Sequence, residues 1–213
     1  PVSISNILAP DPPVITDIDV NPFPGNAVVN GTQTPSDDLN GFIVYTCNGN
    51  VSQAVDTIFD PTATSWENPN SNATQYVEVY NIAAFDSCST SGNGVGNTSI
   101  GPLCVGSLEL DVARNPCEDV ATLTWAGPYS TAGDIIHYEV VMREESPAGS
   151  GNWSAEETLA MLDPSENDFS HQGAVYGNQY EYFIRAHHST NATSVSDIEA
   201  LNFTYPGAPA YIS

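Results

Sequence analysis

The chain has 213 residues, with three Lys plus Arg against 26 Asp plus Glu and a formal net charge of −23 at pH 7. A charge of this sign opposes binding to nucleic acid and to anionic membrane surfaces, so neither is expected as a partner. The apolar runs are only as long as strands, which excludes insertion into a bilayer.

The first half of the chain predicts short strands joined by turns. Residues 14–20 alternate apolar and polar side chains directly after a proline cluster, which is typical of a half-buried strand. The same criteria predict further strands over residues 26–32, 42–47, 53–59, 65–66, 75–85 and 97–103.

The second half repeats this order. The runs Gly41–Tyr45 and Tyr80–Ala84 recur about 100 residues later as His137–Val141 and Tyr182–Ala186. The expected strands cover residues 105–112, 120–125, 135–144, 154–162, 168–171, 179–187 and 194–204.

We therefore expect an all-β chain of two tandem antiparallel β-sandwiches. The two domains are expected over residues 14–104 and 105–205. Residues 1–13 are interpreted as a linker or the end of a preceding module, and residues 206–213 as a linker to a following one.

The two-residue period of a strand also predicts which side chains point inward. In the first domain these are Val29, Phe42, Val44, Tyr80, Ile82 and Ala84. In the second domain they are Leu123, Trp125, Tyr138, Val140, Tyr182, Ile184 and Ala186.

The strand ending in Trp125, the strand around Tyr138 and the run 180–186 resemble a fibronectin type III domain. The resemblance implies that the Tyr180 hydroxyl closes a corner by a hydrogen bond to the backbone. In the first domain Gly31 stands in place of the tryptophan and Glu78 in place of the corner tyrosine. Tyr76 and Trp66 are the candidates to fill that gap.

Residues 83–88, 115–125 and 138–140 are similar to paired type III-like modules in large surface proteins of gliding bacteria, which the type IX secretion system exports. The resemblance implies an extracellular, non-enzymatic structural or adhesive segment at the cell surface, in the form of stalk, spacer or filament-forming modules. Neighbouring modules or identical subunits would be its partners, and surface glycans are a further candidate. The alternative is a pair of accessory carbohydrate-binding modules of a secreted polysaccharide-degrading enzyme.

Four cysteines, Cys47, Cys88, Cys104 and Cys117, are disulfide candidates with three possible pairings. Local crosslinks would join Cys47 to Cys88 and Cys104 to Cys117. The first of these pairs is expected at opposite ends of strands, too far apart for a bond. In the similar surface proteins a cysteine often occupies the position of Glu181, which leaves Cys117 without that partner. Free thiols stay an alternative.

The sequence holds no nucleophile turn, phosphate loop or clustered Cys/His set, so we expect no enzyme, cofactor or structural metal. His187 and His188 are adjacent in one strand and point to opposite sides, which prevents them from sharing an ion. The weak calcium candidates are Asp37 and Asp38 in one loop and Asp163, Glu166 and Asp168 in another.

Two further features are candidate sites. Thr57, in Asp56-Thr57-Ile58, resembles the short O-glycosylation signal of the same bacteria and is the glycosylation candidate. Trp66 and Trp153 are candidates for a glycan-binding platform, because an exposed aromatic ring can stack on the apolar face of a sugar.

The charge imbalance gives a direct prediction. Raising NaCl from low concentration to about 0.5 M should raise the melting temperature, because salt screens repulsion between carboxylates and there are few ion pairs to weaken. Calorimetry across a salt series checks this, and a falling melting temperature would contradict it.

Overall fold

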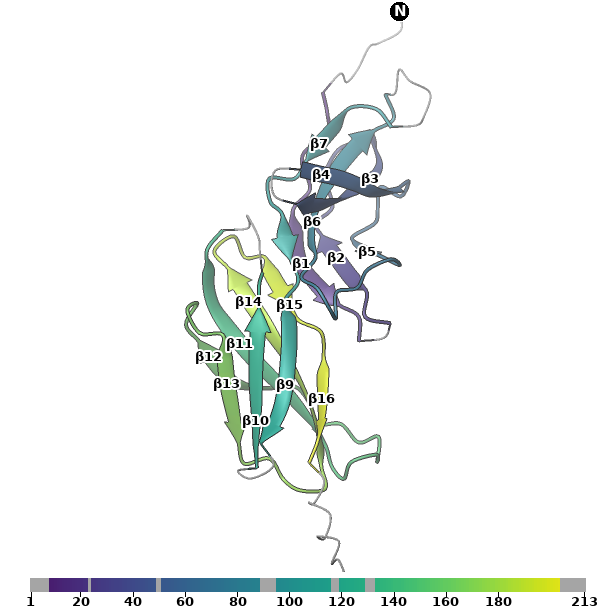
Figure 1. The fold of residues 1–213 in the computed structure, drawn as a ribbon. Helices are drawn as coiled ribbons and strands as arrows, with labels where there is room; N and C mark the ends of the chain where they lie inside the picture. The colour runs from purple at the N-terminus through teal and green to yellow at the C-terminus, as the bar shows by residue number, and fades with distance from the viewer. Residues whose placement is uncertain are drawn as a thin grey trace, which may run out of the picture.

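The computed structural model describes residues 8–22, 24–48, 51–88, 95–115, 119–128 and 133–203. All regular secondary structure in these ranges is β-strand, arranged as two elongated modules end to end (Figure 1). None of these residues belongs to a helix, so the described part of the chain offers no helix that spans a membrane.

The first module is built from two sheets. One contains β1, β2 and β5, and the other has the order β4-β3-β6, with β7 and β8 both paired to β6. The strands are β1 Ile15–Val20, β2 Ala27–Gly31, β3 Leu39–Asn48, β4 Val51–Ile58, β5 Ser65–Glu67, β6 Val79–Asp86, β7 Thr98–Ile100 and β8 Val105–Gly106.

The second module repeats that topology, with β9, β10 and β13 in one sheet and β12-β11-β14 in the other, where β15 and β16 pair with β14. Its strands are β9 Glu109–Asn115, β10 Val120–Ala126, β11 Ile135–Glu145, β12 Glu157–Leu162, β13 Asp168–Gln172, β14 Gln179–His188, β15 Thr193–Val195 and β16 Glu199–Asn202. Among the described residues, every ladder between strands of one module is antiparallel, and the isolated bridge between Leu108 and Ser196 is parallel. The expected fold class, two tandem sandwiches of the fibronectin type III or immunoglobulin kind, is confirmed.

The strands predicted over residues 75–85 and 154–162 begin later, at Val79 and Glu157, and three other predicted strands are divided differently in the structure. The last strand of each module is split into two pieces that pair with the same neighbour, β7 and β8 in one module and β15 and β16 in the other. Residues 105–112 are not one strand, because β8 pairs with β6 of the first module whereas β9 belongs to the second. Val105 lies in the first core, beyond the boundary expected after Cys104.

The predicted inward side chains are confirmed in both modules. The first core contains all six of those predicted there, and the second contains all seven. Tyr80, Tyr182, Phe42, Leu123 and Ile184 are among the largest fully buried side chains. Burial of one such side chain is worth about 1.5–3 kcal/mol, so these positions carry much of each module's stability.

The corner predicted for Tyr180 is present. The backbone N–H of Val175 donates to the Tyr180 hydroxyl at 2.9 Å, and the ring is buried. In the first module the Glu78 carboxylate stands in place of the corner tyrosine and holds the preceding loop. It accepts hydrogen bonds from Ser71 Oγ at 2.5 Å and from the Asn72 backbone N–H at 2.9 Å.

Of the two residues expected to fill the gap in the first core, Trp66 does so and Tyr76 does not. The Trp66 ring meets Tyr80 edge-on at a centroid distance of 5.9 Å. Tyr76 is 64% exposed.

One disulfide joins Cys47, in β3, to Cys104, with Cα atoms 6.4 Å apart. The two local disulfides, Cys47–Cys88 and Cys104–Cys117, were therefore predicted wrongly. Cys104 directly precedes β8, and the fold places it beside Cys47 at the end of β3. Cys88 is exposed, and Cys117 lies outside the described residues.

The two modules share a sheet. Strand β1 of the first module pairs in parallel with β15 of the second, with Asp17 opposite Thr193 and Ile18 opposite Ser194. This pairing extends the β12-β11-β14-β15 sheet into β1-β2-β5 (Figure 1). The joint is thus a hydrogen-bonded ladder.

The tyrosine corner can be tested by replacing Tyr180 with Phe. The change leaves the Val175 N–H without its acceptor and should lower the free energy of unfolding by about 1–2 kcal/mol. Urea denaturation measures the effect, and Tyr76→Phe, at an exposed tyrosine, is the matched control. Equal stabilities for the two variants would contradict a structural role for the corner.

Candidate functional site

Strand pairing lines up outward side chains from both modules on one sheet face. His137 lies opposite His187, His187 opposite Thr193, and Thr193 opposite Asp17. Residues that face each other across a ladder point to the same side of a sheet, so this row runs from β11 to β1.

A second row lies two residues along. Glu139 is opposite Arg185, and Arg185 is opposite Val195. The parallel register of β1 then places Asp19 beside Val195. We call this surface, formed by the outward side chains of β11, β14, β15 and β1, the joint face.

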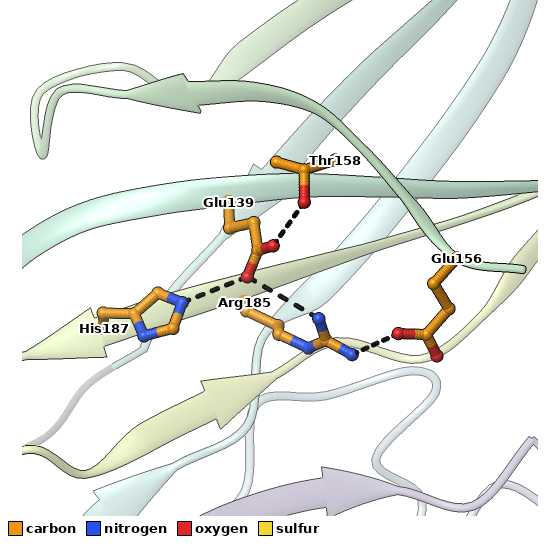
Figure 2. Close-up of polar contacts among 5 residues, drawn as sticks. All are labelled: Glu139, Glu156, Thr158, Arg185 and His187. Carbon is orange, nitrogen blue, oxygen red and sulfur yellow. Dashed lines mark hydrogen bonds and ion pairs between the residues drawn. The ribbon is translucent and has the colours of Figure 1, made fainter.

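Arg185 and Glu139 form the middle of a polar network on the joint face (Figure 2). The Arg185 guanidinium lies 2.7 Å from Glu156 Oε2 and 3.6 Å from Glu139 Oε2. Glu139 also accepts a hydrogen bond from Thr158 Oγ1 at 2.6 Å and lies 3.2 Å from His187 Nε2. One carboxylate therefore contacts a hydroxyl from β12 and an imidazole and a guanidinium from β14.

This arrangement determines the ionisation of the network. Burial by itself would raise the pKa of Glu139, but the hydrogen bonds from Thr158 and His187 and the charge of Arg185 outweigh it and hold the pKa below its ordinary value. Glu139 is therefore a carboxylate at neutral pH.

Asp19 shows the opposite behaviour. Partial burial raises its pKa, and the negative charges of Asp17 and Glu156 raise it further, against a hydrogen bond from the Val20 backbone and the charge of Arg185. Negative charge is thus in excess at the first-module edge of the joint face.

A cavity of about 130 Å³ opens between Asp19 of the first module and the second module's outer sheet surface. Its apolar wall consists of Phe183, Val195 and Ile198. Arg185 lies over the Phe183 ring, with the guanidinium carbon 4.8 Å from the centroid. The cavity thus combines an apolar wall with charged groups from both modules.

The two tryptophans expected to form a glycan platform lie in different modules. Trp66 is in β5, where its Nε1 donates to Asp56 Oδ2 at 2.7 Å. It lines a pocket of about 10 Å³, roughly the room of one water molecule. Trp153 follows β11, and Arg143 lies over its ring at 5.2 Å from the centroid. The structure therefore does not bring the two rings together.

Thr57, the glycosylation candidate, lies in the edge strand β4 and is half-buried. Its backbone N–H donates a hydrogen bond to Asp56 Oδ1 at 2.7 Å. The Asp56 carboxylate thus accepts a hydrogen bond from the Thr57 backbone on one oxygen and from the Trp66 indole on the other. Modification of Thr57 stays a prediction.

The calcium candidates lie in two separate places. Asp163, Glu166 and Asp168 are exposed in and after the turn between β12 and β13. Asp37 and Asp38 precede β3, and Asp38 comes near Asp86 and Cys88, with potential ligand atoms of the three within 4.8 Å of one another. The Asp86 carboxylate already accepts bonds from the Asn97 backbone at 2.8 Å and the Cys88 backbone at 3.0 Å.

The joint face was not predicted from the sequence. The available signal was the scarcity of positive charge: the three basic residues are Arg114, Arg143 and Arg185, and two of them line the cavity. Their partners come from other strands, which a single sequence does not place.

No family model and no curated protein matches this chain. Among solved structures, the chicken interferon gamma receptor alpha chain is 14% identical, with 93% of this chain and 100% of that chain covered and a TM-score of 0.34. Three domains, FN1–FN3, of chicken CNTN1 are 12% identical over 93% of this chain and 65% of theirs, with a TM-score of 0.37.

Pectate lyase PelI from Erwinia chrysanthemi, solved with tetragalacturonic acid, is 19% identical over 44% of this chain, with a TM-score of 0.35. This chain spans 28% of the length of that lyase. Likenesses this weak carry no inference about function.

The Arg185 network can be tested by mutation. Arg185→Met removes the charge that faces the partly buried Glu139 and should lower the free energy of unfolding by about 1–2 kcal/mol at pH 7. The difference should fade as the pH falls below 4.5, where Glu139 takes up a proton in the unfolded chain and then in the folded one. Glu156→Gln, at a side chain that is 53% exposed, is the control and should cost less than about 0.5 kcal/mol. Equal losses in urea denaturation would contradict a central role for Arg185.

Proposed function

We propose that this chain is a non-enzymatic structural segment of an extracellular protein, a stalk or spacer that keeps its two modules in one relative orientation. The observation that carries the proposal is the parallel pairing of β1 with β15, which continues one sheet through the joint. A flexible linker would leave the modules free to reorient, whereas a shared ladder resists bending.

Side-chain packing supports a stiff joint. Ala192 lies in the turn between β14 and β15 of the second module, yet it is 2% exposed and packs in the core of the first. Next to β8, Ser107 exchanges two hydrogen bonds with Glu78: its N–H donates to the Glu78 carbonyl at 2.9 Å, and its Oγ accepts from the Glu78 N–H at 3.0 Å. Leu108 N–H donates to the Val195 carbonyl at 3.2 Å.

The disulfide supports an extracellular setting. Bonds such as Cys47–Cys104 form and persist in oxidising compartments and are rare in the cytosol. This one also ties the residues leading into the joint back to β3, so it restrains the end of the first module where the second begins.

The proposal extends to a large surface protein of gliding bacteria, a setting implied by the resemblance of residues 83–88 and 115–125. Neighbouring modules would then follow at both ends. Strands β4 and β12 end their sheets and offer backbone groups to an identical subunit, which is the route to a filament. The net charge of −23 opposes uncontrolled edge-to-edge association.

The stiffness of the joint is tested by Ala192→Glu, which places a carboxylate in the core of the first module where the second module docks. Small-angle X-ray scattering of the wild type should give one narrow distribution of interatomic distances, and the variant a broader and longer one. Ala155→Glu, at an exposed alanine of the second module, is the matched control. A wild-type distribution as broad as that of Ala192→Glu would contradict the rigid spacer.

A glycan array and analytical ultracentrifugation decide between the forms of the proposal. A spacer retains no sugar and stays monomeric, whereas growth of assemblies with protein concentration favours the filament. Specific retention of a polysaccharide would contradict the spacer and favour accessory carbohydrate-binding modules.

A further inference from the structure

We propose that His137, His187 and Glu139, on the joint face, form a binding site for a divalent transition-metal ion such as Zn²⁺. His137 and His187 lie directly opposite each other on β11 and β14. Their rings are stacked, with centroids 4.4 Å apart and an interplanar angle of 27°. Glu139 is two residues after His137 on the same strand and so points to the same side.

The spacing of these groups suits such an ion. Zinc binds imidazole nitrogen and carboxylate oxygen at about 2.0–2.2 Å in a tetrahedral arrangement, which sets its ligand atoms roughly 3.3–3.5 Å apart. Glu139 Oε2 and His187 Nε2 are 3.2 Å apart, close to that separation. The ion would take the place of the hydrogen bond that now joins them.

The third ligand requires only a side-chain rotation. Opposed residues on antiparallel strands have Cβ atoms about 4.5–5.5 Å apart, which is within reach of a shared ion for two imidazoles. The His137 ring is half-buried and covered on one side by His187. The proposal requires this ring to turn its edge toward Glu139, which would bring a ring nitrogen nearer to Glu139 Oε2 and His187 Nε2.

Charge on the joint face favours a cation. The carboxylates of Asp17, Asp19, Glu139 and Glu156 outnumber the guanidinium of Arg185. Arg143, the other arginine at the cavity, is paired with Glu181. Arg185 keeps Glu156 as a partner when Glu139 turns to the ion.

The ligand types select the class of ion. Two imidazole nitrogens and one carboxylate suit Zn²⁺, Cu²⁺ or Ni²⁺, whereas Ca²⁺ and Mg²⁺ prefer ligand sets made of oxygen. Water would fill the fourth position at this surface. The ion would crosslink β11 and β14, the central pair of the larger sheet of the second module, and so stabilise that module.

The test is calorimetric titration of ZnCl₂ into the full, chelator-treated chain at pH 7.5. We expect one zinc ion per chain, and His137→Gln and His187→Gln should each weaken binding at least about tenfold. Saturating zinc should raise the melting temperature of the wild type, whereas Ca²⁺ at the same concentration should raise it less.

His171→Gln is the matched control, because His171 lies in β13 of the opposite sheet with its Nδ1 2.9 Å from the Tyr182 hydroxyl. It should bind zinc as the wild type does. Melting curves without metal verify that each variant is folded, and Cu²⁺ electron paramagnetic resonance should show two coordinated nitrogens in the wild type and one in each single variant. Wild-type binding equal to that of the His137→Gln/His187→Gln double variant, or an equal loss in His171→Gln, would overturn the site.

Discussion

The parallel pairing of β1 with β15 is the constraint on which the rest of the molecule depends. Each module has a hydrophobic core of its own. The parallel pairing that places Ile18 opposite Ser194 fixes the orientation of one module relative to the other through the backbone. Ala192 adds a side chain from one module to the core of the other. The joint is therefore held by backbone pairing and by side-chain packing together.

Continuity of the sheet also creates the joint face. Asp17 and Asp19 come from the first module, and His187 and Arg185 from the second, yet all point to one side because the strands share a register. A chain with so few cations places two of its three arginines around the cavity there, each over an aromatic ring and each paired with a glutamate. The proposed rigid spacer depends on this shared sheet, whereas the proposed metal site lies on β11 and β14 of the second module alone.

Features that depend on near neighbours in the chain could be predicted. The alternation in β3 and β14 identified Phe42, Val44, Tyr182 and Ile184 as core residues, because side chains two apart point to one side whatever lies across the sheet. The corner at Tyr180 was implied by the resemblance to a fibronectin type III domain, and it joins two residues that are close in sequence.

Contacts between residues that are far apart in the sequence could not be predicted, because they depend on which strands pair and in which register. The bond between Cys47 and Cys104 spans 57 residues, and the sequence offered no means to choose it. The histidines show the same limit: composition drew attention to the neighbours His187 and His188, which point apart, while the pair that meets is His137 and His187.

The amino-acid sequence by itself determined that this chain forms two acidic all-strand sandwiches and which side chains fill them, because periodicity and turn residues act over a few positions. Only the tertiary structure decided how the modules join, which cysteines bond and which charged groups meet, because each depends on strands that pair across long stretches of chain.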